Sequence, residues 1–318
     1  MRKSSRLAAA LLLCLTLCAC GAVQKPQTPY RMVLITKSTT TQFWLSAIAG
    51  AGAAKAEYNV ELGIVGPETE EDYESQNRYI RQAVEDGADA IIFSAVSYSE
   101  NAEAINEAAS AGVRIVVIDS GVDSDQVSAR IGTDNLEAGR MAASAALDTG
   151  AEALYVGVVS FDQTSRNGQE REMGLADAFR RDARVREVRT LHVQTSPEAA
   201  REGAKRLLAE HPETNVLIGL NEPLSVGVGM AAEELGLGDA VRVVGFDTNV
   251  HCVELLRSGD MSALIVQNPY AMGYLGVETA WKILEGQPFD AVIDTSTAIV
   301  TRDNMFSAEG QQALFSFS

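Results

Sequence analysis

Two segments of this chain repeat one design, and this repeat constrains the fold more than any other feature of the sequence. Each copy starts with a polar residue that ends an apolar run, continues through a helical pattern and a glycine, and finishes with an aspartate after a second apolar run. The first copy spans 25 positions from Ser94 to Asp119, and the second spans 26 from Asn221 to Asp247. Two copies of one strand–helix–strand design predict two similar α/β lobes.

Short β-branched runs alternate with longer helical patterns along the rest of the chain. Such alternation is typical of parallel sheets with helices on both faces. The pattern is interrupted near residues 131–135 and then restarts, and one helix after the restart is expected over residues 169–181. We therefore predict an α/β fold made of two doubly wound parallel-sheet lobes.

The first 19 residues are predicted to be a secretory signal peptide, because a positively charged start precedes an apolar run, residues 7–17, that is short for a membrane span. The sequence LCACG at residues 17–21 resembles a bacterial lipobox, in which the cysteine after a small residue, here Cys20, is lipidated. A plain cleavage site or an uncleaved anchor is the alternative. Residues 20–30 are then expected to form a lipidated tether.

The chain is strongly acidic, with a formal net charge of −17. Loss of the signal peptide would remove three basic residues and no acidic one, which gives −20. A surface of this sign repels phosphate backbones and anionic lipids, so nucleic-acid binding is disfavoured and membrane attachment should come from the lipid. Of the four cysteines, Cys252 alone would stay unmodified, so we expect no internal disulfide and a small buried residue there.

Hydrogen-bonding side chains follow the apolar runs at the points where the predicted strands end. In open parallel sheets these carboxyl ends form the ligand site. The candidates are Lys37, Ser94, Asp119, Asn221, Asp247 and Gln267. They offer donors and acceptors but no nucleophile and base pair, which suits a neutral polyhydroxylated ligand. An aspartate or asparagine at such a position can also be a simple helix N-cap, and Lys37 can be merely solvated.

An aromatic pair, Phe43 and Trp44, opens the first predicted helix. Consecutive helical positions do not face the same core stripe, so at least one ring is expected to face the cleft and stack on the apolar side of a sugar. Farther along this helix, Gly50 and Gly52 are expected to permit close packing on the sheet.

Enzyme signatures are mostly missing. The chain has no Gly-x-Ser-x-Gly elbow and no phosphate-binding Gly-Lys-Ser/Thr loop, and its three histidines are far apart in sequence. We therefore expect a protein that is not an enzyme, with no catalytic residue, metal or cofactor.

Several short motifs, taken in order, resemble the type I periplasmic sugar-binding proteins of the ribose, allose and galactose group. They are KST at 37–39 with FW at 43–44, VID at 117–119, GTDN at 132–135, RE-x-G at 171–174, LNE at 220–222, VGFD at 244–247 and VQNP at 266–269. The resemblance covers nearly the whole mature chain. It implies sugar contacts at the six strand-end candidates and at Phe43 and Trp44.

The sequence departs from the ribose type at two positions. Gln169 stands where ribose-type receptors carry a sugar-binding arginine, and Thr195 stands where they carry an aromatic residue. Gln169 is therefore included among the predicted ligand contacts. Lys37 makes the chain more similar to the allose type, and the identity of the sugar stays open.

The resemblance also implies a hinge in which the chain crosses three times between the lobes. The expected N-terminal lobe comprises residues 31–133 and 268–293, and the expected C-terminal lobe comprises residues 134–267 and 294–318. The implied protein is a monomeric, lipid-anchored extracytoplasmic receptor that delivers a small sugar or polyol to an ABC permease. A ligand receptor for a chemoreceptor or a two-component sensor domain, without a transport role, is the alternative.

Overall fold

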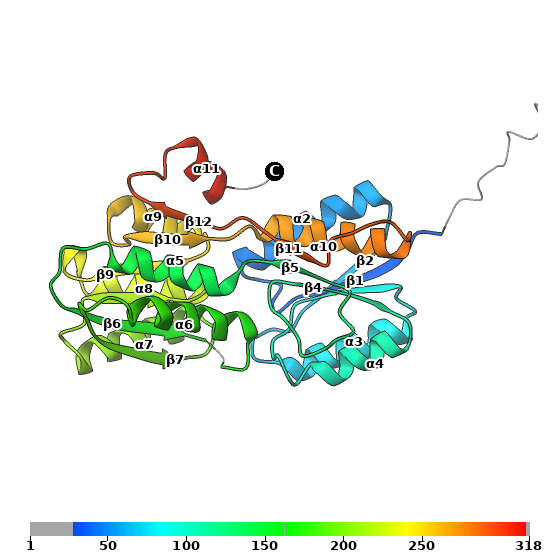
Figure 1. Ribbon diagram of the computed structural model, residues 1–318, viewed down its shortest axis with the longest axis horizontal. Coiled ribbons are helices and arrows are strands. Elements are labelled where there is room, and N and C mark those ends of the chain that lie inside the picture. The colour runs from blue at the N-terminus through cyan, green and yellow to red at the C-terminus, as the bar shows by residue number, and fades with distance from the viewer. Residues whose placement is uncertain (1–27, 162, 316–318) are drawn as a thin grey trace, which may run out of the picture.

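The computed structural model describes residues 28–161 and 163–315. The predicted signal peptide and Cys20 lie outside the described residues. Two lobes lie side by side along the long axis of the molecule, each built around one sheet (Figure 1).

The N-terminal lobe contains a six-stranded sheet in which every neighbouring pair is parallel. In spatial order its strands are β11 (Val292–Asp294), β5 (Ala129–Gly132), β4 (Arg114–Ile118), β3 (Ala90–Phe93), β1 (Arg31–Ile35) and β2 (Glu61–Val65). Its helices are α2 (Gln42–Tyr58), α3 (Tyr73–Glu85), α4 (Ala102–Ser110) and α10 (Pro269–Leu284). In Figure 1, α2 and α10 cover one face of this sheet, and α3 and α4 cover the other.

The C-terminal lobe also contains a six-stranded sheet, parallel except where β12 runs against β10. In spatial order its strands are β12 (Ala298–Thr301), β10 (Ala263–Val266), β9 (Arg242–Phe246), β8 (Val216–Gly219), β6 (Leu154–Ser160) and β7 (Val185–His192). Its helices are α5 (Asn135–Leu147), α6 (Arg166–Phe179), α7 (Pro197–Glu210), α8 (Glu222–Glu234), α9 (Val250–Ser258), α11 (Ala308–Leu314) and the short 3-10 helix η2 (Gly238–Ala240).

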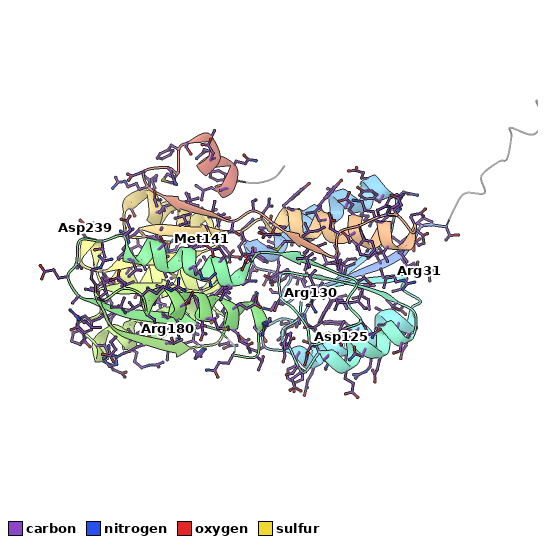
Figure 2. The ribbon with its side chains drawn as sticks, in the orientation of Figure 1. Arg31, Asp125, Arg130, Met141, Arg180 and Asp239 are labelled. Atoms are coloured by element: carbon purple, nitrogen blue, oxygen red, sulfur yellow. The ribbon has the colours of Figure 1, made fainter. Side chains whose placement is uncertain are left out.

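The chain passes from one sheet to the other at three places: between β5 and α5, between β10 and α10, and between β11 and β12. The central strands β3, β8 and β10 are buried at every position, as expected when helices cover both faces of a sheet. Charged side chains such as Arg31, Asp125, Arg180 and Asp239 project outward (Figure 2). The predicted fold class is confirmed. The lobe boundaries given above remain our proposal.

Helix starts in the C-terminal half follow simple capping chemistry. Ser196 accepts a hydrogen bond from Ala199 N at the start of α7, and Asn221 accepts one from Leu224 N at the start of α8. Asn268 accepts one from Ala271 N at the start of α10. In each case a proline lies within the first turn, where its missing N–H is not needed. These caps place the strand-to-helix loops at the cleft.

Glycines pack helix against helix, and the prediction that Gly50 and Gly52 pack on the sheet is wrong. A Cβ at Gly50 would lie 2.0 Å from Tyr270 O of α10, and a Cβ at Gly273 would lie 1.8 Å from Ala47 O of α2. The two helices therefore cross with their backbones in contact. A Cβ at Gly52 would meet no heavy atom of the described chain within 4 Å.

We expect Gly273→Ala to destabilise the N-terminal lobe by about 3 kcal/mol or more, because the added methyl can be accommodated only by separating two backbones. Gly52→Ala, in the helix that faces Gly273, is the matched control. It should stabilise the protein by about 0.5–1 kcal/mol through helix propensity alone. Urea unfolding of both variants checks this, and equal effects would contradict the proposed crossing.

No helix within residues 28–161 and 163–315 combines the length and the apolar character needed to span a membrane.

Candidate functional site

Fourteen residues from both lobes line a narrow cavity between the carboxyl ends of the two sheets. The lining residues are Lys37, Thr41, Phe43, Trp44, Glu70, Asp119, Phe161, Asn167, Arg171, Asn221, Glu222, Pro223, Asp247 and Gln267. Polar groups from both lobes therefore face one small space between the lobes.

Asp119 and Asp247 present their carboxylates from matched positions in the two lobes. Each directly follows a strand, and each has a left-handed backbone, with φ of 56° and 66° respectively. The backbone N–H of each donates to the neighbouring strand, to Ile131 O at 2.9 Å and to Ile265 O at 2.8 Å. A positive φ is uncommon outside glycine but is tolerated by aspartate. The same unusual backbone conformation therefore directs one carboxylate from each lobe toward the cleft.

Arg171 is the largest positive group buried in the C-terminal lobe, with 1% of its surface exposed. Its Nε donates to Asn135 Oδ1 at 2.9 Å and its Nη1 donates to Leu220 O at 2.7 Å. The guanidinium also lies over the Phe246 ring, 4.6 Å from its centroid. Its Nη2 is buried without a hydrogen-bond partner in the described part of the chain, so one donor of the fork remains free for a ligand.

Burial raises the pKa of Asp247 to about 7, while the nearby Arg171 and the Gln267 side chain act to lower it. Asp247 Oδ1 accepts a hydrogen bond from Gln267 Nε2 at 2.6 Å, and Gln267 Oε1 is buried without a partner among the described residues. A ligand hydroxyl placed here can donate to one group and accept from another. The site therefore has unused hydrogen-bonding capacity among the described residues.

Lys37 is buried, with 2% of its surface exposed, so it is not a solvated surface residue. Its Nζ donates across the cleft to Ser165 Oγ at 2.8 Å and lies 5.4 Å from the Phe161 ring centroid. Phe43 and Trp44 both line the cavity in an edge-to-face arrangement, with ring centroids 5.0 Å apart. Aromatic surface thus borders the cavity beside its polar groups, an arrangement suited to a sugar ring.

Two predicted contacts do not line the cavity. Ser94 lies behind Asp119 and donates to its Oδ2 at 3.0 Å, so it positions that carboxylate. Gln169 lies elsewhere on α6, and its side chain donates to Gln163 O at 2.6 Å. The reason is helical phase: α6 begins at Arg166, before the predicted start, and the residue two positions after Asn167 points away from it.

The cavity contains residues that the sequence analysis did not select. Asn167 and Arg171 are four residues apart on α6 and therefore share one face, and Asn167 Nδ2 donates to Asp119 Oδ1 at 3.1 Å across the cleft. The other lining residues that were not selected are Thr41, Glu70, Phe161, Glu222 and Pro223. A serine N-cap at Ser165, followed by polar residues with this helical spacing, is the signal that could have revealed the α6 pair.

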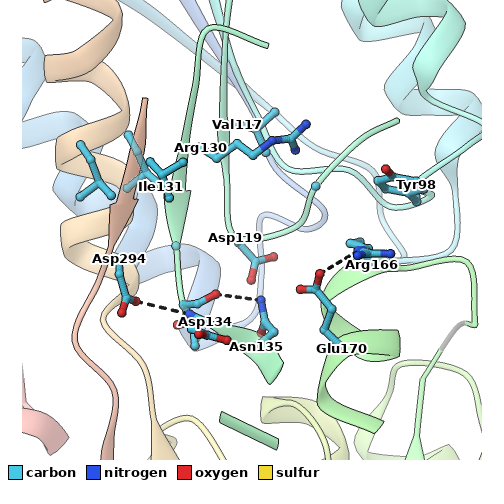
Figure 3. Close-up of a pocket in the computed structure, with 15 residues that line it drawn as sticks. Tyr98, Val117, Asp119, Arg130, Ile131, Asp134, Asn135, Arg166, Glu170 and Asp294 are labelled. Carbon is cyan, nitrogen blue, oxygen red and sulfur yellow. Dashed lines mark hydrogen bonds and ion pairs between the residues drawn. The ribbon is translucent and has the colours of Figure 1, made fainter. Parts of the chain in front are cut away.

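A wider pocket, with a volume of about 560 Å³, lies on the hinge side of Asp119 (Figure 3). Its polar groups bond to other protein groups: Arg166 Nε forms an ion pair with Glu170 Oε1 at 2.7 Å, and the backbone N–H of Asp134 donates to Asp294 Oδ1 at 3.4 Å. These contacts lie on opposite sides of the pocket in Figure 3. Because the smaller cavity has the free buried arginine and glutamine groups, the smaller cavity is the candidate ligand site.

Two similar α/β lobes with a closed polar site between their sheets define a bilobal binding protein. The chain belongs to the periplasmic binding protein family, because residues 32–288 match the model described as a periplasmic binding protein domain. The resemblance to type I periplasmic sugar-binding proteins is confirmed. Family and structural relatives are binding proteins for transport, so this protein is not an enzyme.

Similar proteins include the D-ribose/D-allose-binding protein of Pseudomonas aeruginosa, which is 29% identical over 94% of this chain and 98% of its own length. Among solved structures, a carbohydrate transporter solute binding protein from Agrobacterium radiobacter in complex with D-arabinose matches with a TM-score of 0.88 and 28% identity, over 91% of this chain and all of the other. An ABC transporter solute binding protein from Agrobacterium vitis with bound D-fucose matches with a TM-score of 0.87 and 27% identity. The match covers 90% of this chain and 100% of the other.

Proposed function

We propose that this protein captures a single neutral monosaccharide or polyol between its lobes and delivers it to an ABC importer on the extracytoplasmic side. The observation that carries this proposal is the interlobe cavity, in which free hydrogen-bonding groups of Arg171 and Gln267 adjoin the aromatic pair Phe43 and Trp44. The similar proteins named above bind or transport sugars, which supports the same ligand class here.

Closure follows from the placement of these groups. Asp119 and Lys37 belong to one lobe, whereas Asn221, Asp247 and Gln267 belong to the other, so they can surround one ligand only when the lobes converge. A ligand that binds both sets shifts the hinge equilibrium toward the closed state. The closed state is then the form that an importer can distinguish from the empty receptor.

Isothermal titration with D-ribose, D-allose, D-arabinose, D-fucose and simple polyols tests the proposed function. We expect at least one of these compounds to bind, and small-angle scattering to show a smaller radius of gyration after its addition. Absence of binding across the whole panel would refute the proposed ligand class.

Trp44→Leu should weaken binding of that sugar at least about tenfold, because the apolar residue cannot replace the indole face or its Nε1 bond of 2.9 Å to Glu70 Oε1. Leu45→Ala, at the next and half-exposed position of α2, is the matched control and should bind normally. Equal affinities for both variants would show that the ring pair is not part of the site.

Membrane attachment through a lipidated Cys20, and a monomeric receptor, also belong to this proposal. The lipobox-like sequence supports the anchor. Incorporation of an alkyne fatty acid by the full chain, lost in Cys20→Ser, tests it.

A further inference from the structure

We propose that Glu71 and Glu222 form a two-sided latch that holds the cleft closed and sets how long the ligand stays bound. Each carboxylate reaches from its own lobe to a backbone N–H of the other lobe. Glu222 Oε2 accepts from Phe43 N at 2.8 Å, and Glu71 Oε1 accepts from Thr195 N at 2.7 Å. This inference rests on the proposed function, because it assumes a ligand that is released when the lobes open.

The contact made by Glu222 replaces a missing helix cap. Thr41 occupies the N-cap position of α2 without a side-chain capping bond, and the first turn of α2 has no acidic residue. Glu222 supplies a negative charge to this helix end from the opposite lobe, where the helix dipole favours it. Asn249 Nδ2 donates to the other oxygen, Oε1, at 2.9 Å and fixes the carboxylate in place. A backbone N–H in the first turn of α2 therefore receives its acceptor from the opposite lobe, a contact that opening of the cleft would break.

The contact made by Glu71 lies beside the start of α7, next to the capping residue Ser196. Two of its atoms, Glu71 Oε2 and Thr195 Oγ1, are buried without a hydrogen-bond partner in the described part of the chain. Opening of the cleft would expose both atoms to water again. The closed state therefore carries a desolvation penalty at these two oxygens, and this penalty keeps closure reversible.

The two contacts border one vestibule. A pocket outside the ligand cavity is lined by Glu70, Thr195, Ser196, Glu222 and Asn249, among others. It adjoins the cavity at Glu70 and Glu222, which line both spaces. Both oxygens of Glu222 are already occupied by protein donors, so the latch acts on the closing of this side and not on recognition of the sugar.

Dissociation rates test the latch, with the panel sugar that binds the wild type most tightly as the probe. We expect Glu222→Gln and Glu71→Ala each to raise the dissociation rate about tenfold, because each removes one charge-assisted hydrogen bond of the closed state. The order of preference among the panel sugars should stay unchanged, and the melting temperature of the unliganded protein should not fall. Glu233→Gln, exposed on α8, and Glu68→Ala, exposed in the loop before α3, are matched controls that should leave the rate unchanged.

Unchanged dissociation rates in both latch variants would overturn the inference, as would a changed order of sugar preference, since that would make the carboxylates direct ligand contacts. If one variant is poorly folded, the dissociation rate of the other still tests the inference, because the two residues lie in different lobes. Failure of the wild type to bind any panel sugar would instead refute the proposed function.

Discussion

Asp247→Asn should lose sugar affinity about 100-fold and, at the same time, raise the melting temperature of the unliganded protein at pH 8. The affinity falls because an ionised carboxylate that accepts from sugar hydroxyls is replaced by a neutral amide, a loss of about 2–3 kcal/mol. The amide keeps an oxygen to accept from Gln267 Nε2, so the local packing is retained.

The gain in stability follows from the raised pKa of Asp247, which is about 7 in the folded protein against an ordinary 3.8. Between these two values the folded state holds a proton that the unfolded state releases, so the free energy of unfolding of the wild type falls as pH rises toward 7. The difference between the two pKa values corresponds to a destabilisation of the folded wild type by about 4 kcal/mol. This destabilisation is present in full above pH 7. Below pH 4 the cost disappears.

Thermal melts of the wild type and Asp247→Asn at pH 5 and pH 8 measure this effect. We expect a difference of several degrees at pH 8 and a smaller one at pH 5. Asp239→Asn, exposed at the surface of the same lobe, should show no difference at either pH. A variant that is less stable than the wild type at pH 8 would contradict the proposed cost of burying this carboxylate.

Arg171→Met should destabilise the C-terminal lobe by about 3–5 kcal/mol and abolish sugar binding. The substitution leaves Asn135 Oδ1 and Leu220 O without their donor and removes the positive charge that lowers the pKa of Asp247. Arg171→Lys keeps the charge but loses the fork and the stacking on Phe246, so it should recover part of the stability and little of the affinity.

The double variant Arg171→Met with Asp247→Asn separates charge from packing. Because the amide needs no neighbouring cation, the double variant should be more stable than the sum of the single effects by about 1–3 kcal/mol. Urea unfolding of the four proteins gives this coupling energy. Strict additivity would mean that the guanidinium and the carboxylate do not interact in the empty cleft.

Much of the fold was predictable because local sequence patterns indicate its strands, its helices and its repeat. The matched placement of Asp119 and Asp247 predicted two similar lobes, and the structure gives both residues the same backbone conformation. Strand ends were predictable in the same way, since apolar runs end where polar residues enter the cleft, and Lys37, Asn221 and Gln267 all line the cavity.

The remainder of the site depends on features that local patterns do not contain. Gln169 was selected through its correspondence to an arginine of ribose-type receptors, whereas the residues of α6 that line the cavity are Asn167 and Arg171. Which side of α6 faces the cleft depends on how the helix packs, and a local pattern does not contain this information. Ser94 has the expected position but acts through Asp119. The contacts of Glu71 and Glu222 join residues more than a hundred positions apart, and they arise only when two separately folded lobes meet.

The most direct test of the central claim is mass spectrometry of the compound that the protein retains. The mature protein is incubated with an equimolar mixture of neutral monosaccharides and polyols, freed of unbound compounds by gel filtration, and then denatured. We predict the release of one chemically unchanged sugar or polyol in a near-stoichiometric amount, and its absence from Asp247→Asn. Release of no compound, or of a chemically altered one, would contradict a receptor that binds its ligand in the cleft without reacting with it.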